Sequence, residues 1–291
     1  MAFSANTVGD TTWRRKFFSN LIQETLKNAL IAEKICQVDR TDNRYIYNPY
    51  GSAPTTTVSA LDGTYSVSTY TTTNDTLEVL TEFKVAEQIY GYEEVLSNFN
   101  LFSSRMNEMA ASVATAIDKY VLNRLCEDGT GTYTTPTGGF TTAANFNTIC
   151  ANLLSKVAGY AVQFSGLFLV VENTDLTGII QAQGTNGFSM ADAALRNGFL
   201  NSWMGIDIYV ARTGTFSNSD GTNEGGGGAY TNSGHRVFGV KGITTYAAPR
   251  GLKWEELVVT GATGKEVRCW GLIGFKAWYA KNALIVDITL A

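Results

Sequence analysis

The sequence predicts an α+β protein in which a long extended hairpin precedes one long helix and a compact α/β platform follows it. Three observations support this fold class. Residues 98–127 keep a helical apolar period without Pro or Gly, residues 39–92 contain strand-like alternation, and apolar segments of helix and strand type alternate after residue 142. The chain is long enough, at 291 residues, to bury a sizeable core.

The N-terminal part, residues 1–38, is expected to be an arm followed by a helix. Residues 1–12 are small and polar without a period, and indicate a flexible arm. A rough helical period then predicts a first helix over about residues 13–38. The cations Arg14, Arg15 and Lys16 lie at its start, where they either face solvent or contact a phosphate backbone.

Residues 39–92 predict a hairpin that is polar on both faces. Ser and Thr make up 13 of the 26 residues in 51–76, which contain no Lys or Arg, and Asn74 and Asp75 are typical of a turn. Two strands alone are marginal in water, so we expect the hairpin to lie on a neighbouring subunit. A surface loop of a monomer is the alternative. The residues expected to make the inter-subunit contact are Tyr65, Val67, Tyr70, Leu77, Val79 and Phe83.

The helix predicted over residues 98–127 organises the rest of the chain. Its apolar residues recur mostly at steps of three and four, which places them on one buried face. Asp128 and Gly129 supply the stop. The residues expected to form the core of this spine helix are Phe102, Met106, Met109, Val113 and Ile117.

The second half predicts a platform and then a strand-rich return. Residues 129–141 read as a linker, residues 142–159 as an amphipathic helix, and residues 167–171 as a strand buried on both faces. Residues 213–234 form a Gly-rich loop that lacks the strand and helix context of a phosphate site. Strands then continue to the end of the chain, with a tight turn at residues 261–264.

Composition excludes several classes of function. The net charge of −4 and a single His argue against a general nucleic-acid binder and against a His-based metal or catalytic site. Cys36, Cys126, Cys150 and Cys269 are widely spaced and are expected to be buried free thiols, with two disulfides as the alternative. We expect no cofactor, no metal, no signal peptide and no membrane span.

Catalytic motifs are also missing from the sequence. His235 directly follows the Gly-rich loop and is expected to be a loop residue, since no nucleophile elbow is present, and the adjacent pairs at 93–94 and 255–256 do not place two carboxylates in one site. The protein is therefore expected to act through its surfaces and not as an enzyme.

The order of these parts resembles the major capsid protein of tailed bacteriophages, with the Hong Kong 97-type fold. The segments that carry the resemblance are residues 81–91, 198–210 and 237–243. The resemblance implies an extended loop at 39–92, a peripheral domain with the spine helix at 93–141, an axial domain at 142–235, and a return to the peripheral domain at 236–291. It also implies a three-fold contact at Gly261, Thr263 and Gly264.

The same resemblance implies partners and a location. Copies of the chain would form pentamers and hexamers in an icosahedral shell that encloses double-stranded DNA, with Arg14, Arg15 and Lys16 as inner-surface contacts. A separate scaffolding protein and a portal would take part, and the shell would assemble in the host bacterial cytoplasm and become the virion capsid. Lys84 lies near the base of the loop, so covalent crosslinking is not carried over.

Three other functions remain open from the sequence. An encapsulin-like compartment shell shares the fold and encloses cargo enzymes. A secreted carbohydrate-binding β-rich protein would fit the Thr, Tyr and Trp content, although the absence of a signal peptide argues against it. A hydrolase that uses His235 is the third.

Overall fold

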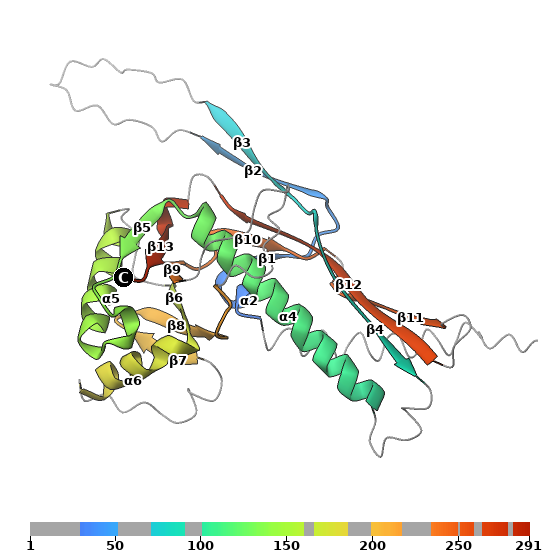
Figure 1. The fold of residues 1–291 in the computed structure, drawn as a ribbon. Coiled ribbons are helices and arrows are strands. Elements are labelled where there is room, and N and C mark those ends of the chain that lie inside the picture. The colour runs from blue at the N-terminus through green and yellow to red at the C-terminus, as the bar shows by residue number, and fades with distance from the viewer. Residues whose placement is uncertain are drawn as a thin grey trace, which may run out of the picture.

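The described part of the chain folds into two sheets and a two-stranded ribbon, arranged as an elongated unit beside a compact one (Figure 1). The elongated unit holds five strands and one long helix, and the compact unit holds six strands. The protein is thus a mixed α/β structure. The computed structural model describes residues 30–51, 71–90, 101–159, 166–185, 199–216, 234–249, 251–258, 264–278 and 282–291.

Strand β12 (Gly264–Ala277) is the axis of the five-stranded sheet. It pairs antiparallel with β4 (Thr81–Tyr90) and β11 (Lys253–Val258) along its first part and with β10 (Thr244–Ala247) near its end. The short strand β1 (Gln37–Asp39) then pairs parallel with β10. One 14-residue strand therefore pairs both with β4, which lies far away in the sequence, and with the neighbouring strands β10 and β11.

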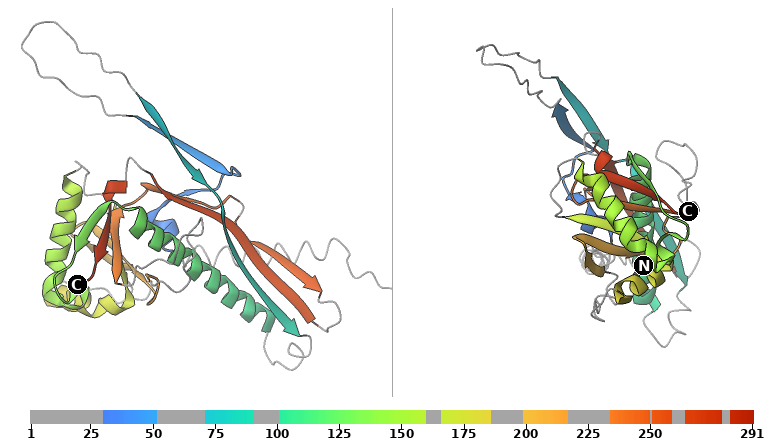
Figure 2. Two further views of the ribbon diagram at one scale, coloured as in Figure 1. Left: turned by 45° about the horizontal axis from the view of Figure 1, so that its top comes forward. Right: turned by 90° about the vertical axis from the view of Figure 1, so that its left-hand side faces the viewer.

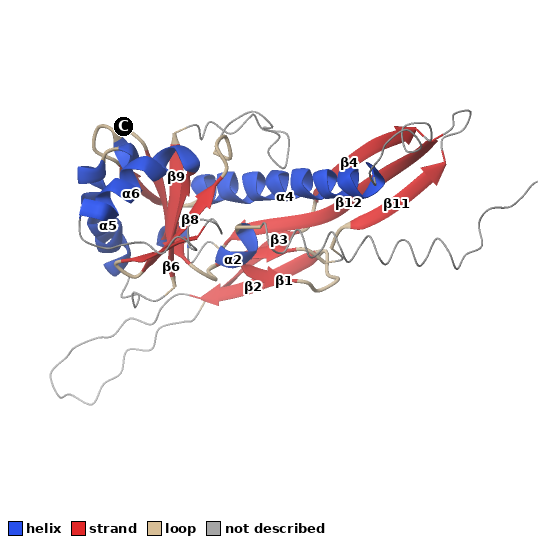
Figure 3. Ribbon diagram, turned by 90° about the horizontal axis from the view of Figure 1, so that it is seen from below, coloured by secondary structure: helices blue, strands red, loops and turns tan. Residues whose placement is uncertain are grey.

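Helix α4 (Leu101–Asp128) lies along one face of this sheet, as Figure 3 shows. Its 28 residues correspond to about 42 Å. Met106, Met109, Val113 and Ile117 are buried in the core that the helix shares with the sheet. Phe102 lies within α4, but its side chain is outside the described part of the structure.

The compact unit contains a six-stranded sheet covered on both faces. The sheet order is β5-β13-β9-β6-β8-β7, and the strands are β5 (Gly131–Thr134), β13 (Ile285–Thr289), β9 (His235–Val240), β6 (Leu167–Glu172), β8 (Ile206–Ala211) and β7 (Phe199–Trp203). Leu167 and Leu169 share a core with helices α5 (Ala143–Ala158) and α6 (Leu176–Thr185), whereas Phe168 and Val170 belong to the core of α4. This explains why every residue of β6 is buried.

The ribbon consists of β2 (Tyr45–Gly51) and β3 (Thr72–Glu78), paired antiparallel from Tyr45 opposite Glu78 to Gly51 opposite Thr72. It leaves the elongated unit and projects beyond both sheets (Figure 2). Three short 3-10 segments complete the described elements, at Gly139–Thr141, Asn173–Asp175 and Asn282–Leu284.

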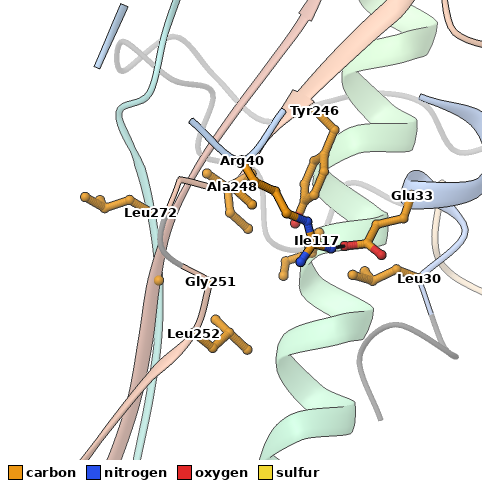
Figure 4. A pocket seen from close by; sticks show the side chains of 11 residues that line it. Leu30, Glu33, Arg40, Ile117, Tyr246, Ala248, Gly251, Leu252 and Leu272 are labelled. Carbon is orange, nitrogen blue, oxygen red and sulfur yellow. Dashed lines mark hydrogen bonds and ion pairs between the residues drawn. The ribbon is translucent and has the colours of Figure 1, made fainter. Parts of the chain in front are cut away.

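A small cavity of about 50 Å³ separates α4 from the five-stranded sheet. Figure 4 shows Ile117 of α4, Tyr246 of β10 and Leu252 around it. An ion pair of 3.2 Å between Arg40 and Glu33 lies beside the cavity.

Two local sequence predictions are wrong. The first helix does not continue to residue 38: α2 (Ala32–Ile35) ends before Cys36, whose extended backbone leads into β1, because the edge of β10 offers a pairing partner. Asn74 and Asp75 form no turn, because they lie in β3 opposite Pro49 and Asn48. In both places a strand partner distant in sequence overrides local preference.

The chain is also divided between its two sheets differently from the sequence prediction. Residues 131–134, expected to be linker, form β5 beside β13. The strands of residues 236–291 are divided between the two sheets: β9 and β13 belong to the six-stranded sheet, whereas β10, β11 and β12 belong to the five-stranded sheet.

Candidate assembly surface

The root of the ribbon is anchored in the body of the subunit by apolar contacts. Leu77 and Val79 form a small core cluster with Ala247 and Trp278. The indole nitrogen of Trp278 donates a hydrogen bond of 2.9 Å to Oγ1 of Thr245, which fixes the ring against β10. The end of β3 is therefore a fixed part of the subunit.

Polar contacts reinforce this anchor. The ammonium group of Lys276 in β12 donates to the backbone oxygen of Thr76 at 2.8 Å and forms an ion pair with Asp75. The backbone approaches closely here, since a Cβ on Gly274 would lie 3.1 Å from Cα of Val79. These contacts set the direction in which the ribbon leaves the body.

The ribbon exposes aromatic side chains near its root, where Tyr45 lies opposite Glu78 and Tyr47 opposite Thr76. Tyr45 and Tyr47 are 42% and 64% exposed, and their rings stack with centroids 6.4 Å apart. The guanidinium of Arg44 lies 5.3 Å from the centre of the Tyr45 ring and pairs with Glu78 at 2.8 Å. The hydrogen bond to Glu78 raises the pKa of Tyr45. Such an exposed aromatic pair is typical of a contact surface.

A hollow of about 460 Å³ lies beside the root of the ribbon. Leu80 and Leu272, which are 53% and 44% exposed, line it together with Trp270 and Pro249, and Arg44 and Lys253 supply its positive charge. The hollow is on the side of the sheet opposite α4, because neighbouring residues of β12 such as Ile273 are buried toward that helix. A projecting ribbon and an apolar hollow thus occur on one subunit.

The structure places the predicted contact residues in different environments. Leu77 and Val79 are buried at the ribbon root, and Phe83 packs edge-on against Tyr120 of α4 with ring centroids 5.7 Å apart, so these three residues stabilise the subunit itself. Gly264 begins β12 opposite Tyr90. The other predicted residues lie outside the described part: Tyr65, Val67, Tyr70, Gly261, Thr263, Arg14, Arg15 and Lys16.

Sequence reasoning did not assign Tyr45, Tyr47, Leu80 or Leu272 to the surface. The signal for the tyrosines was present, since strand alternation at residues 45–47 places Ile46 on one face and both rings on the other. Strand alternation likewise places Leu80 on the face of Glu78 and Glu82, whereas its closeness to Leu272 follows only from the pairing of β4 with β12.

The groups considered for catalysis are engaged in structural contacts. Nδ1 of His235 lies 2.9 Å from the carboxylate of Asp287. Burial raises the pKa of the Cys126 thiol well above its usual value, with the nearby Asp287 carboxylate as a further cause. Burial likewise raises the pKa of Cys36, Cys150 and Cys269 to about 12. These thiols stay protonated and are poor nucleophiles.

All four cysteines are buried and free. Among the described residues, no three His, Cys, Asp or Glu side chains are grouped so that they would hold a metal ion. Within the same residues, none of the helices has the length and apolar character needed to cross a membrane.

Comparison with known proteins identifies the fold. No protein-family model and no curated protein sequence matches the chain. Solved structures do: the capsid of cyanophage P-SCSP1u is similar at 10% identity and a TM-score of 0.67 over 88% of this chain and 86% of that one. The mature capsid of bacteriophage PhiM1 gives 10% identity and a TM-score of 0.67 over 90% and 87%.

A virus-like particle from Pyrococcus furiosus is also similar, with 9% identity and a TM-score of 0.61 over 94% of this chain and 99% of that one. At such identities the likeness establishes the fold alone. The class is therefore that of proteins with a capsid-shell fold. Within this class, several of the matching structures come from phages, so the chain has the fold found in phage capsids.

Proposed function

We propose that this chain is the major capsid protein of a tailed bacteriophage, with the Hong Kong 97-type fold, and that its copies assemble into an icosahedral shell. The observation that carries the proposal is the pair of surfaces on one subunit: an anchored ribbon that projects away from the body (Figure 2), and an apolar hollow beside its root. Its role is structural, without enzymatic activity.

The position of the two surfaces favours a closed assembly. A ribbon that points away from its own hollow is available to a second copy. Contacts between two different patches are heterologous, and they generate rings when the rotation closes. This supports pentamers and hexamers in which the extended loop of residues 39–92 lies across a neighbouring subunit. The Gly261, Thr263 and Gly264 turn is assigned to contacts at three-fold axes.

The energetics agree with this arrangement. The two-stranded ribbon pairs with no third strand among the described residues, and such a ribbon is marginal in water by itself. Covering Tyr47, Leu80 and Leu272 at a contact would remove apolar area from water, at about 25 cal/mol per Å². Assembly thus stabilises a segment that the isolated subunit leaves exposed.

We assign the domains by their sheets. The peripheral domain comprises α4 and the five-stranded sheet, and the axial domain comprises the six-stranded sheet with α5 and α6. Residues 131–134 and 285–289 then belong to the axial domain, which revises the boundaries expected from the sequence.

The proposal includes partners and a location. The shell encloses double-stranded DNA, with Arg14, Arg15 and Lys16 as inner-surface contacts. A separate scaffolding protein and a portal take part in assembly in the host bacterial cytoplasm, and the mature shell is the virion capsid.

Electron microscopy of the purified full chain, with a mass measurement of the particles, tests the proposal. We expect closed shells. A chain that stays monomeric at high concentration would contradict the assignment. Particles that contain protein cargo in place of DNA when produced with their natural partners would support the alternative of an encapsulin-like compartment, which the Pyrococcus furiosus likeness keeps as the second candidate.

Two variants test the ribbon and the hollow separately. One replaces residues 52–71 by Asn-Gly, a two-residue turn that joins Gly51 to Thr72 and removes the residues between β2 and β3. The other carries Leu80→Asp and Leu272→Asp. Each should fold and remain unassembled. Mixed together, they retain one full-length extended loop and one intact hollow, so heterologous contact predicts complexes of two subunits that do not grow. Normal shells from either variant alone would refute the contact.

A further inference from the structure

A second hollow, of about 510 Å³, lies on α4 on the side opposite its buried residues. Its floor is formed by small side chains of the helix, Ala111, Ser112 and Ala116. Its rim carries Lys119 of α4 together with Arg212 and Thr213 from the loop that follows β8. This hollow and the ribbon-root hollow are therefore on opposite surfaces of the elongated unit.

The loop that carries Arg212 is fixed in place by buried contacts. Oε1 of Glu172 accepts the backbone N–H groups of Gly214 and Phe216, both at 3.1 Å. From the other side, the amide of Asn123 in α4 donates to the backbone oxygen of Thr215 at 2.9 Å. Gly214 has φ 84°, a conformation that favours glycine.

A buried ion network lies beneath this loop. The guanidinium of Arg236 contacts the carboxylates of Glu172 and Asp175, and the three residues are only 4%, 8% and 1% exposed. Burying three charges is costly, and such networks are better explained by a fixed geometry than by net stability. What they fix here is the position of Arg212 and Thr213 beside α4.

The lining indicates the chemistry of the ligand. The hollow contains no large apolar side chain, so it offers little to an apolar helix of a protein partner. Within the described residues, no carboxylate forms an ion pair with the exposed Arg212. Glu108, the one carboxylate in the lining, is paired with Arg105 at 2.8 Å. Cations, hydroxyls and a floor of small residues suit an extended, hydrated polyanion.

Two cations on the opposite surface have acidic partners. On the outer side of the sheet, Lys84 pairs with Glu82 at 3.3 Å, and Arg268 pairs with Glu266 at 2.6 Å. Since these carboxylates neutralise Lys84 and Arg268, a polyanion is attracted more to Arg212 than to these two cations.

We propose that the hollow between α4 and residues 212–215 binds the phosphate backbone of double-stranded DNA, with Arg212 and Lys119 as the phosphate contacts. The surface of α4 that carries it then faces the packaged DNA. That the polyanion is packaged DNA rests on the proposed function, whereas binding of a polyanion to the hollow can be measured on the unassembled subunit.

Salt-dependent binding of a DNA duplex to the unassembled full-length subunit tests this proposal. Each phosphate contact contributes about 0.9 to the slope of log K against log salt concentration. The double variant Arg212→Gln, Lys119→Gln should therefore lower the slope by about 1.8. The double variant Lys84→Gln, Arg268→Gln, with the same loss of two charges on the opposite surface, should leave it unchanged. Arg212→Lys should retain the slope, because lysine also contacts phosphate.

Three results would overturn the proposal: no binding of the duplex, equal slopes for the two double variants, or an acidic helical peptide that binds this hollow in place of DNA. Electron microscopy of the same variants separates the two claims. If the subunit forms closed shells but the Arg212→Gln, Lys119→Gln variant keeps the wild-type salt slope, the proposed function stands and this DNA site is refuted. If the variant lowers the salt slope but the subunit forms no shells, the site stands and the proposed function is refuted.

Discussion

The carboxylate of Asp118, within α4, accepts a hydrogen bond of 3.0 Å from the backbone N–H of Ile31, 87 positions earlier in the chain. Its other oxygen accepts the N–H of Ala32 at the same distance. A side chain of the long helix thus caps α2, and the described part of the chain begins by attaching to the middle of the elongated unit.

We expect the stability contributed by Asp118 to increase as pH falls. Burial, partly opposed by the two backbone N–H groups, raises the pKa of Asp118 from 3.8 to about 6. The folded state then binds the proton more tightly than the unfolded state does. The contribution is fully present below about pH 4 and is lost as pH rises through about 6.

The variant Asp118→Asn provides the comparison, because its amide does not titrate. The difference between the two pKa values corresponds to about 3 kcal/mol. Between pH 4 and pH 7, the unfolding free energy of the wild type should therefore fall by up to about this amount relative to the variant. Urea unfolding at several pH values measures it, and parallel pH profiles would contradict the assignment.

Replacing Ile117 should reveal how the long helix is held. Ile117 is buried in the core and borders the cavity of about 50 Å³ (Figure 4). Ile117→Ala enlarges this cavity and should lower the unfolding free energy by about 3 kcal/mol. Ser112→Ala, on the exposed side of the same helix, should change it by less than about 0.5 kcal/mol. If urea unfolding gave the same loss of unfolding free energy for the two variants, Ile117 would not be the side of the helix that faces the core.

The elements that the sequence predicts well are those with a local signal. The helical period of residues 98–127 corresponds to α4 at Leu101–Asp128, and the apolar run at residues 167–171 corresponds to β6, which is buried on both faces. These patterns report burial directly, because one period fixes which side chains face the core.

The assembly surface depended instead on pairing between distant segments. Asn74 and Asp75 favour turns, yet β2 supplies a partner that keeps them extended. Leu80 and Leu272 become neighbours only through the pairing of β4 with β12. The buried position of Leu77 depends on Ala247 and Trp278, which come from two other segments of the chain. No short-range pattern encodes such contacts.

Gly274 should control the direction of the ribbon. A methyl group there would lie 3.1 Å from Cα and from Cγ2 of Val79, so Gly274→Ala must displace the root of the ribbon. Overpacking of this kind typically costs about 1–3 kcal/mol. We expect a folded subunit with strongly reduced shell formation. Gly159→Ala is the matched control, because its methyl group would lie 3.8 Å from the nearest atom. Normal assembly of both variants, scored by electron microscopy, would mean that the root tolerates movement.

Removal of Arg236 should destabilise the compact unit more than removal of any surface cation. Arg236→Met would leave the buried carboxylates of Glu172 and Asp175 without their cation, and breaking a buried pair typically costs about 3–5 kcal/mol. Lys84→Met, which removes an exposed ion pair, should cost less than about 1 kcal/mol. Arg236→Lys keeps a cation beside the two carboxylates and should cost less, so urea unfolding of the two variants distinguishes an electrostatic cause from a loss of packing. An equal loss for both variants would assign the effect to packing around Phe216, whose ring lies 5.4 Å from the guanidinium carbon.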